Sequence, residues 1–311
     1  MASWHDILNQ IQSDSANCDK IRRGYLNELA KYTGRPAIAY YSGFNGTRIA
    51  ASPQDRHDLA INDNDMNGFM AVIHQLPRDR GLDLILNTPG GDVAATEAIV
   101  NYLHYAFGKD IRAIVPQQAM SAGTMIALAC TEVIMGMHSS LGPIDPQIGG
   151  VPAHGIIEEF EKIQKAFRED PKGAMAYRPI LERYSPTTLG NCEKAIEMAG
   201  GMVRKWLGEG MLSGVRDKEA KLEQILKHFG DHSTTLNHAR HISYEQVKAS
   251  GITVKRLEDY PNCPELQDRV LSVHHAMMVT FGISRSLKII ENSIGATFVR
   301  KSVKPTGNAP V

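Results

Sequence analysis

The stretch LDLILNTPGGDVAATEAIVNYLHYAFGKDIRAIVP (82–116) decides the fold of this chain. Its opening residues, 82–88, form a short and almost continuously apolar run, which is typical of a strand buried on both faces. A Gly-rich turn follows, and residues 93–107 then repeat apolar residues at helical spacing. A second strand of the buried type is expected at 111–116. This strand–helix–strand order predicts a β-α-β unit and therefore a parallel sheet.

The same alternation continues on both sides of this stretch. Further strands are expected at 35–44 and 132–136, and a helix end, a cap at Gly251 and a returning strand are expected within 247–259. Helices are predicted at 4–32 (one amphipathic helix or two), 66–76, directly after 116, 156–167, 174–184, 192–207 and 266–280. The pattern as a whole indicates the α/β class.

Composition and charge exclude several classes of function. The 311 residues are 42% apolar and 22% charged, and Lys+Arg and Asp+Glu balance at 34 each. No gross basic excess points to nucleic acid, so we expect no such partner. The four cysteines are scattered and are expected to be free thiols. The N-terminus lacks the apolar core of a signal peptide, and no apolar run approaches the ~18 residues of a spanning helix, so a cytoplasmic protein without a transmembrane segment is predicted.

Two strand-to-helix loops carry residues suited to chemistry. In NTPGGD (87–92), the paired glycines leave backbone amides accessible at a helix N-terminus, although a plain β-α turn would also use glycine. In QQAMSAGT (117–124), Ser121 is either a helix N-cap or a nucleophile. Ligands bind at the carboxyl ends of strands in open α/β sheets, where both loops are expected. A hydroxyl on one loop and free amides on the other are the parts needed for acyl transfer.

These loops resemble those of the Clp-protease/crotonase superfamily. The motifs that carry the resemblance are TPGGD (88–92), SAGT (121–124) and IALACTEVIMGMHSSLGPIDPQ (126–147). Within the superfamily, the chain is most similar to serine peptidases of the signal peptide peptidase A and NfeD-linked type, and more narrowly to the serine dehydrogenase proteinase family. The resemblance implies a Clp/crotonase-like α/β fold with repeated β-β-α units around a mainly parallel sheet. It also implies an oxyanion hole formed by Gly90, Gly91 and the amide of Ala122.

The resemblance also divides the chain. The expected units are a helical N-terminal extension (1–34), a peptidase domain (35–260), a helical C-terminal segment (261–300) and a disordered tail (301–311).

The general base of the expected site lies outside the two loops. A serine hydroxyl needs a base, and no histidine stands where the Clp proteolytic subunit has one; His138 is interpreted as a loop residue. The resemblance to the NfeD-linked type instead implies Lys162 in GIIEEFEKIQK (155–165), as part of a Ser-Lys dyad. At about 100° per residue, Lys162 falls on the flank of the apolar stripe of its helix, whereas Lys165 falls opposite the stripe and is expected to be solvated.

Other polar residues have less specific interpretations. His228, His232, His238 and His241 crowd one segment, but no cysteine or carboxylate pattern completes a metal site, so none is predicted. Asp145 could orient Lys162 or shape the GPIDP turn, and the turn is favoured. Thr124 could bond near Lys162 or to its own helix.

We therefore predict a serine endopeptidase that works through an acyl-enzyme without a cofactor or metal. Its expected substrates are peptides or unfolded proteins, with membrane proteins as possible targets, and relatives suggest a homo-oligomer. The competing interpretations are an acyl-CoA hydratase or isomerase of the crotonase branch, and a non-catalytic scaffold of the same fold.

Overall fold

A computed structural model describes residues 3–13, 18–45, 52–230 and 237–302 of the chain. The helical elements are α1 (Trp4–Ser13), α2 (Cys18–Thr33), α3 (Pro53–Leu59), α4 (Asn64–Ile73), α5 (Val93–Phe107), α6 (Ala122–Leu128), α7 (Ala153–Glu169), the 3₁₀ helix η1 (Gly173–Tyr177), α8 (Arg178–Leu181), α9 (Thr188–Glu209), α10 (Lys218–Gly230), α12 (Tyr244–Ala249) and α13 (Leu266–Ile283). The strands are β1 (Ala37–Ser42), β2 (Leu82–Asn87), β3 (Ile111–Val115), β4 (Gln118–Ala119), β5 (Glu132–Met135), β6 (Ser140–Leu141), β7 (Gln147–Ile148), β8 (Val151–Pro152), β9 (Ile242–Ser243), β10 (Val254–Arg256), β11 (Ser286–Asn292) and β12 (Thr297–Lys301).

The body of the molecule is a mainly parallel sheet of seven strands in the order β10-β5-β3-β2-β1-β11-β12. The first five of these strands run parallel to one another, whereas β11 is antiparallel to β1 and β12 to β11. This is a mixed α/β fold, as the alternating pattern predicted. The expected strands at 35–44, 82–88, 111–116 and 132–136 correspond to β1, β2, β3 and β5, and the returning strand within 247–259 is β10.

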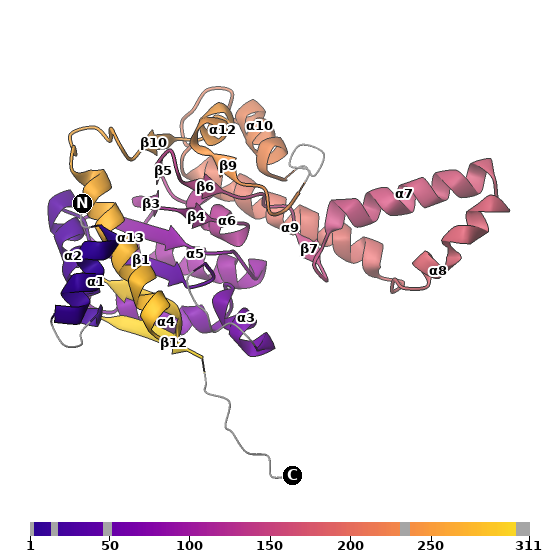
Figure 1. Ribbon diagram of the computed structural model, residues 1–311. Coiled ribbons are helices and arrows are strands. Elements are labelled where there is room, and N and C mark those ends of the chain that lie inside the picture. The colour runs from indigo at the N-terminus through magenta and orange to yellow at the C-terminus, as the bar shows by residue number, and fades with distance from the viewer. Residues whose placement is uncertain (1–2, 14–17, 46–51, 231–236, 303–311) are drawn as a thin grey trace, which may run out of the picture.

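Both faces of the sheet are covered by helices, which explains why its strands are apolar on both sides. In β1, Ile38 and Tyr40 point into the core beneath α4, α5 and α6, and Ala39 and Tyr41 point toward α2 and α13. All four side chains are buried. Figure 1 shows α13 and α2 crossing one side of the sheet, with the first helix, α1, beside them.

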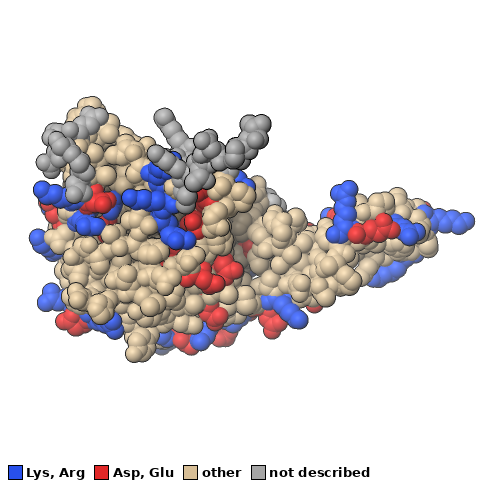
Figure 2. Space-filling view, turned by 90° about the horizontal axis from the view of Figure 1, so that it is seen from below, with Lys and Arg blue, Asp and Glu red and all other residues tan. Residues whose placement is uncertain are grey.

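An arm projects from this body. It consists of α7, η1, α8 and the first part of α9, and it extends well beyond the sheet in Figures 1 and 2. Inside the arm, Ile156 on α7 packs with Cys192 on α9, and the rings of Phe160 and Tyr184 meet edge to face at 5.1 Å. The arm therefore has a small apolar core of its own.

The C-terminal part of the chain contains strands as well as the expected helix. Residues 261–300 were expected to be helical, but only α13 is, and β11 and β12 complete the sheet. Strand β11 is difficult to predict from the sequence because it contains Lys288 and Glu291, and charged residues are rarely buried unless they are paired. The expected disordered tail (301–311) lies outside the described residues from 303 onward. None of the described helices is both long enough and apolar enough to cross a membrane.

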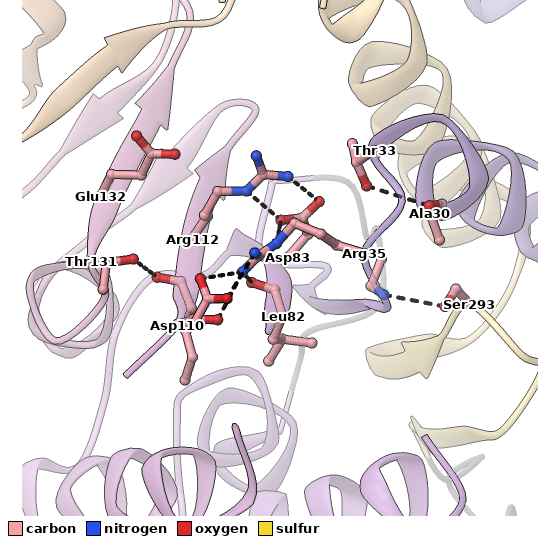
Figure 3. Close-up of polar contacts among 12 residues, drawn as sticks. Ala30, Thr33, Arg35, Leu82, Asp83, Asp110, Arg112, Thr131, Glu132 and Ser293 are labelled. Atoms are coloured by element: carbon pink, nitrogen blue, oxygen red, sulfur yellow. Dashed lines mark hydrogen bonds and ion pairs between the residues drawn. The ribbon is translucent and has the colours of Figure 1, made fainter. Parts of the chain in front are cut away.

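The starts of the parallel strands are held by a polar network at the edge opposite the loops that follow their carboxyl ends (Figure 3). Buried Asp83 on β2 accepts hydrogen bonds from Arg112 at 2.6 and 2.7 Å and from Arg35 at 3.1 Å. Arg35 also reaches Asp110. This network fixes one end of the sheet and leaves the other end to the loops that carry Ser121 and the glycine pair.

Candidate active site

Ser121 stands at the entrance of α6 in a strained backbone conformation. Its φ of 50° and ψ of −117° lie in a region that non-glycine residues rarely adopt, and its side chain makes no capping hydrogen bond to the helix. Ser121 thus occupies the N-cap position of α6 without the capping hydrogen bond that the N-cap interpretation expected. Strained residues of this kind persist only where their surroundings hold them, and in α/β-hydrolases a sharp strand-to-helix turn exposes a nucleophilic serine hydroxyl.

Thr124 holds the Ser121 turn in place. Its buried hydroxyl lies 2.7 Å from the Ala119 carbonyl oxygen and 2.9 Å from that of Gly142, and it accepts a hydrogen bond from the Gly142 amide at 2.9 Å. These bonds tie α6 to both β4 and the chain after β6. Neither sequence interpretation of Thr124 anticipated this role.

The glycine loop packs directly against the Ser121 turn. The Thr88 amide donates to the Gln118 carbonyl at 3.0 Å, and the Met120 amide donates to the Thr88 carbonyl at 3.0 Å. A Cβ atom on Gly90 would lie 2.6 Å from the Met120 carbonyl oxygen and 2.7 Å from the Cβ of Ser121. Only glycine permits this approach, so the two loops expected to form one site do lie together.

Two backbone amides remain available beside Ser121. Ile61 pairs with the glycine loop, because its amide donates to the Gly90 carbonyl at 2.8 Å and its carbonyl accepts from Asp92 at 2.9 Å. The intervening Gly91 amide therefore points away from Ile61, and among the described residues it has no acceptor. The Ala122 amide, in the first turn of α6, likewise has none there.

The Gly90 amide differs from these two, because it already donates to the Thr88 hydroxyl at 3.2 Å. Of the three residues expected to form the oxyanion hole, Gly91 and Ala122 thus have free donors, and Gly90 has the steric role.

A histidine–aspartate pair lies at the neighbouring strand end. His238 Nδ1 is 2.8 Å from Asp145 Oδ1, and the Asp145 side chain is fully buried whereas that of His238 is 28% exposed. Asp145 follows β6 and His238 precedes β9, and these two strands pair in the small sheet β4-β6-β9. In this sheet β6 runs parallel to β4 and antiparallel to β9. This sheet brings Gly142, directly after β6, beside the Ser121 turn, since a Cβ on Gly142 would lie 3.1 Å from the Ser121 nitrogen.

Sequence reasoning missed this pair, because its members are 93 residues apart and no local pattern joins them. His238 was considered for a metal site, and its segment for contact with the peptide, but not as a general base; Asp145 was considered for its turn or as a partner of Lys162. The one usable signal was the histidine-rich segment itself. Among the described residues, no group of three or more His, Cys, Asp or Glu side chains could hold a metal ion.

Lys162, the base that the resemblance implies, lies outside the two loops and the histidine–aspartate pair. It lies on α7 in the projecting arm, and its side chain is 71% exposed and 3.9 Å from Glu159. Lys165, expected to be solvated, is exposed to a similar extent. Helix α7 packs against α9 and η1, and α6, which follows Ser121, packs against α5 and α9. No described contact joins Lys162 to Ser121.

An apolar pocket adjoins the histidine–aspartate pair. It encloses about 210 Å³ between the chain after β6 and the helices α7, α9 and α10. Its lining residues are Ile144, Asp145, Pro146, His154, Ile196, Ala199, Gly200, Leu226 and Gly230. The volume suits one apolar side chain, since an engineered cavity of about 150 Å³ holds benzene.

A strained serine at a helix entrance, packed against a glycine pair beyond the carboxyl ends of parallel strands, is an arrangement suited to acyl transfer. Residues 58–177, which include both loops and the first part of the arm, match the family of ClpP-like SDH-type serine proteinases. The resemblance expected from the motifs is confirmed over this segment.

Two curated relatives come from Methanocaldococcus jannaschii. The uncharacterized protein MJ0137 is 43% identical over 98 residues, which cover 32% of this chain and 34% of that protein. The uncharacterized protein MJ1495 is 41% identical over 124 residues, which cover 37% of this chain and 42% of that protein. The chain thus spans well under half the length of the curated relatives it matches.

Proposed function

We propose that the chain is a serine peptidase in which Ser121 attacks the carbonyl carbon of a peptide bond. The strained backbone of Ser121, without a capping bond, is the observation that carries this proposal. The hydroxyl would form an ester with the acyl part of the substrate as the amine product leaves, and water would then hydrolyse the ester. The amides of Gly91 and Ala122 would donate to the oxyanion of each tetrahedral intermediate. Gly90 would allow the two loops to approach.

His238, oriented by Asp145, is the general base in this proposal, because the small sheet β4-β6-β9 connects the segments of both residues to the strand that leads into Ser121. A buried carboxylate that accepts from one ring nitrogen fixes the tautomer and leaves the other nitrogen to take the serine proton. The Ser-Lys dyad predicted from the resemblance stays a second candidate. Because Lys162 is exposed on the arm, it could serve only if the arm of another copy, or a rearrangement, brought it to Ser121.

The proposed substrate class is based on the pocket beside Asp145. Its predominantly apolar lining suits an apolar side chain of a peptide or an unfolded protein. A homo-oligomer that restricts access to the site belongs to the same proposal, and the projecting arm is an element through which copies could meet.

A fluorophosphonate probe tests the nucleophile and the base together. Wild type should be labelled, and Ser121→Ala should not. His238→Ala should slow labelling by about 10²- to 10⁴-fold, as expected for loss of a general base. His241→Ala is the matched control, because His241 is bonded to Ser140 and not to Asp145.

The same assay decides between the two bases. Lys162→Ala and Lys165→Ala, on one helix and similarly exposed, should both label like wild type. A loss confined to Lys162→Ala, with His238→Ala unaffected, would establish the dyad instead. A folded wild type that never reacts would refute the peptidase and leave the acyl-CoA enzyme or the scaffold.

A further inference from the structure

A buried ion pair lies behind the glycine loop. Lys288 on β11 and Asp65 on α4 are both about 1% exposed or less, and Lys288 Nζ lies 2.7 and 2.8 Å from the two carboxylate oxygens of Asp65. The remaining ammonium hydrogen points to the Ala60 carbonyl oxygen, 2.6 Å away. Burial lowers the pKa of Lys288, and the Asp65 carboxylate opposes that change.

The first connection from this pair to the site runs through the backbone. Lys288 holds the carbonyl of Ala60, and the next residue, Ile61, makes the two hydrogen bonds that flank Gly91. Asp65 also accepts from the Asn62 amide at 3.1 Å. Both members of the ion pair thus hold the backbone of segment 60–62 in place through hydrogen bonds.

The second connection runs through Tyr40 and Thr88. The Tyr40 hydroxyl donates to Asp65 at 2.7 Å, and the Thr88 side chain lies close enough to that hydroxyl to oppose the rise that burial causes in the pKa of Tyr40. The Thr88 hydroxyl in turn accepts from the Gly90 amide at 3.2 Å. The Tyr40 ring is fixed by stacking on Phe69, with centroids 5.7 Å apart and planes 7° from parallel. Both connections, the one through segment 60–62 and the one through Tyr40 and Thr88, therefore end on the glycine loop.

Stability alone does not account for this arrangement. A buried ion pair is often no more stabilising than apolar residues of similar size, because desolvation of the two charges offsets their attraction. What the pair adds is a fixed position for the atoms it bonds. Oxyanion donors act only when they are held where the charge develops.

We propose that Lys288 and Asp65 are positioning residues that hold the Gly91 amide in its orientation toward the oxyanion. The inference rests on the proposed function, because it assigns a purpose to the Gly91 donor. The two residues touch no substrate and act only through segment 60–62 and through Tyr40 and Thr88.

The decisive experiment removes the pair without leaving a lone buried charge. The double variant Lys288→Met/Asp65→Leu should lower kcat for peptide hydrolysis by about 10- to 100-fold and leave KM unchanged. It should weaken a peptide aldehyde, which forms a tetrahedral adduct with serine, by a similar factor. The matched control is Arg22→Met/Glu291→Leu, which removes another fully buried pair between α2 and the same strand β11. That control should keep wild-type kcat and aldehyde affinity.

A milder pair of variants covers the case in which the double variant does not fold. Tyr40→Phe cuts only the second connection and should lower kcat and aldehyde affinity by about 3- to 10-fold, within the value of one hydrogen bond. Tyr41→Phe is its control, since that neighbouring hydroxyl is equally buried but lies 3.3 Å from His274 on the other face of the sheet.

The outcomes separate this inference from the proposed function. Ser121-dependent hydrolysis that is the same in Tyr40→Phe and Tyr41→Phe, or in the two double variants, would overturn the inference alone. A wild-type chain without Ser121-dependent hydrolysis would overturn both.

Discussion

Replacement of Gly90 by alanine tests whether close packing against Ser121 is needed for the reaction. The φ of Gly90 is +93°, so any Cβ there costs about 1–3 kcal/mol in backbone strain. The added atom would also lie 2.6 Å from the Met120 carbonyl oxygen and 2.7 Å from the Ser121 Cβ, and neither neighbour is a flexible chain end. We expect this overlap to cost about 1–3 kcal/mol more.

Gly295 supplies a matched control for the strain. It has a similar φ of +102°, in the turn between β11 and β12, but a Cβ there would meet no atom within 4 Å. Gly295→Ala should therefore show the strain without the overlap. The difference in unfolding free energy between Gly90→Ala and Gly295→Ala, measured by urea denaturation, isolates the contact with the Ser121 turn.

The functional measurement is the rate of fluorophosphonate labelling per folded molecule. Gly295→Ala should react like wild type, and Gly90→Ala should react about 100-fold more slowly, because the overlap displaces the hydroxyl or the amide opposite it. Equal labelling rates in the two folded variants would show that the approach of the two loops is not required.

Three further predictions concern stability and reactivity. Burial lowers the pKa of His274 from 6.5 to about 3, so between these values the unfolded chain binds one more proton than the folded chain and stability falls as the pH drops. Acidification from pH 7 to pH 5 should remove about 2 kcal/mol from the unfolding free energy, and His274→Gln should abolish this share of the pH dependence. Burial raises the pKa of Cys130 to about 12, so iodoacetamide at pH 8.5 should alkylate it only in denaturant, whereas partly exposed Cys18 is the accessible comparison in the native chain. Asp83→Asn should destabilise the chain by about 3–5 kcal/mol, because it leaves the guanidinium of Arg112 without its buried partner, yet labelling of the folded fraction should be unchanged, since this network lies at the other end of the strands.

Local patterns were enough to predict the central sheet and the two loops. The strands β2 and β3 are continuous apolar runs, and α5 begins and ends where its periodicity does. The loops between them were recognisable because glycine and serine stood at strand-to-helix junctions. Ser121 and the glycine pair could therefore be chosen as candidates from the sequence, but the backbone strain of Ser121 could not be predicted.

Contacts between distant segments could not be predicted in the same way. The pair His238–Asp145 depends on the register of β6 against β9. These strands have two residues each, which is too short for an apolar pattern that would predict their pairing. Strand β11 was not predicted, because charged residues such as Lys288 and Glu291 are typical of exposed segments. Their burial depends on ion pairs with Asp65 and Arg22, which lie far away in the sequence. The place of Lys162 on a projecting arm likewise depends on how α7 leaves the body, not on its own apolar stripe.

The position of β11 in the sheet has a consequence for the order of synthesis. This strand lies between β1 and β12, although it is translated long after the strands on the other side of β1. While the polypeptide is still growing on the ribosome, β1 has an unpaired edge and Lys288 has not yet reached Asp65. The pairing at this edge of β1, and the hydrogen bond from Lys288 to the Ala60 carbonyl, therefore wait for the synthesis of residues 286–292.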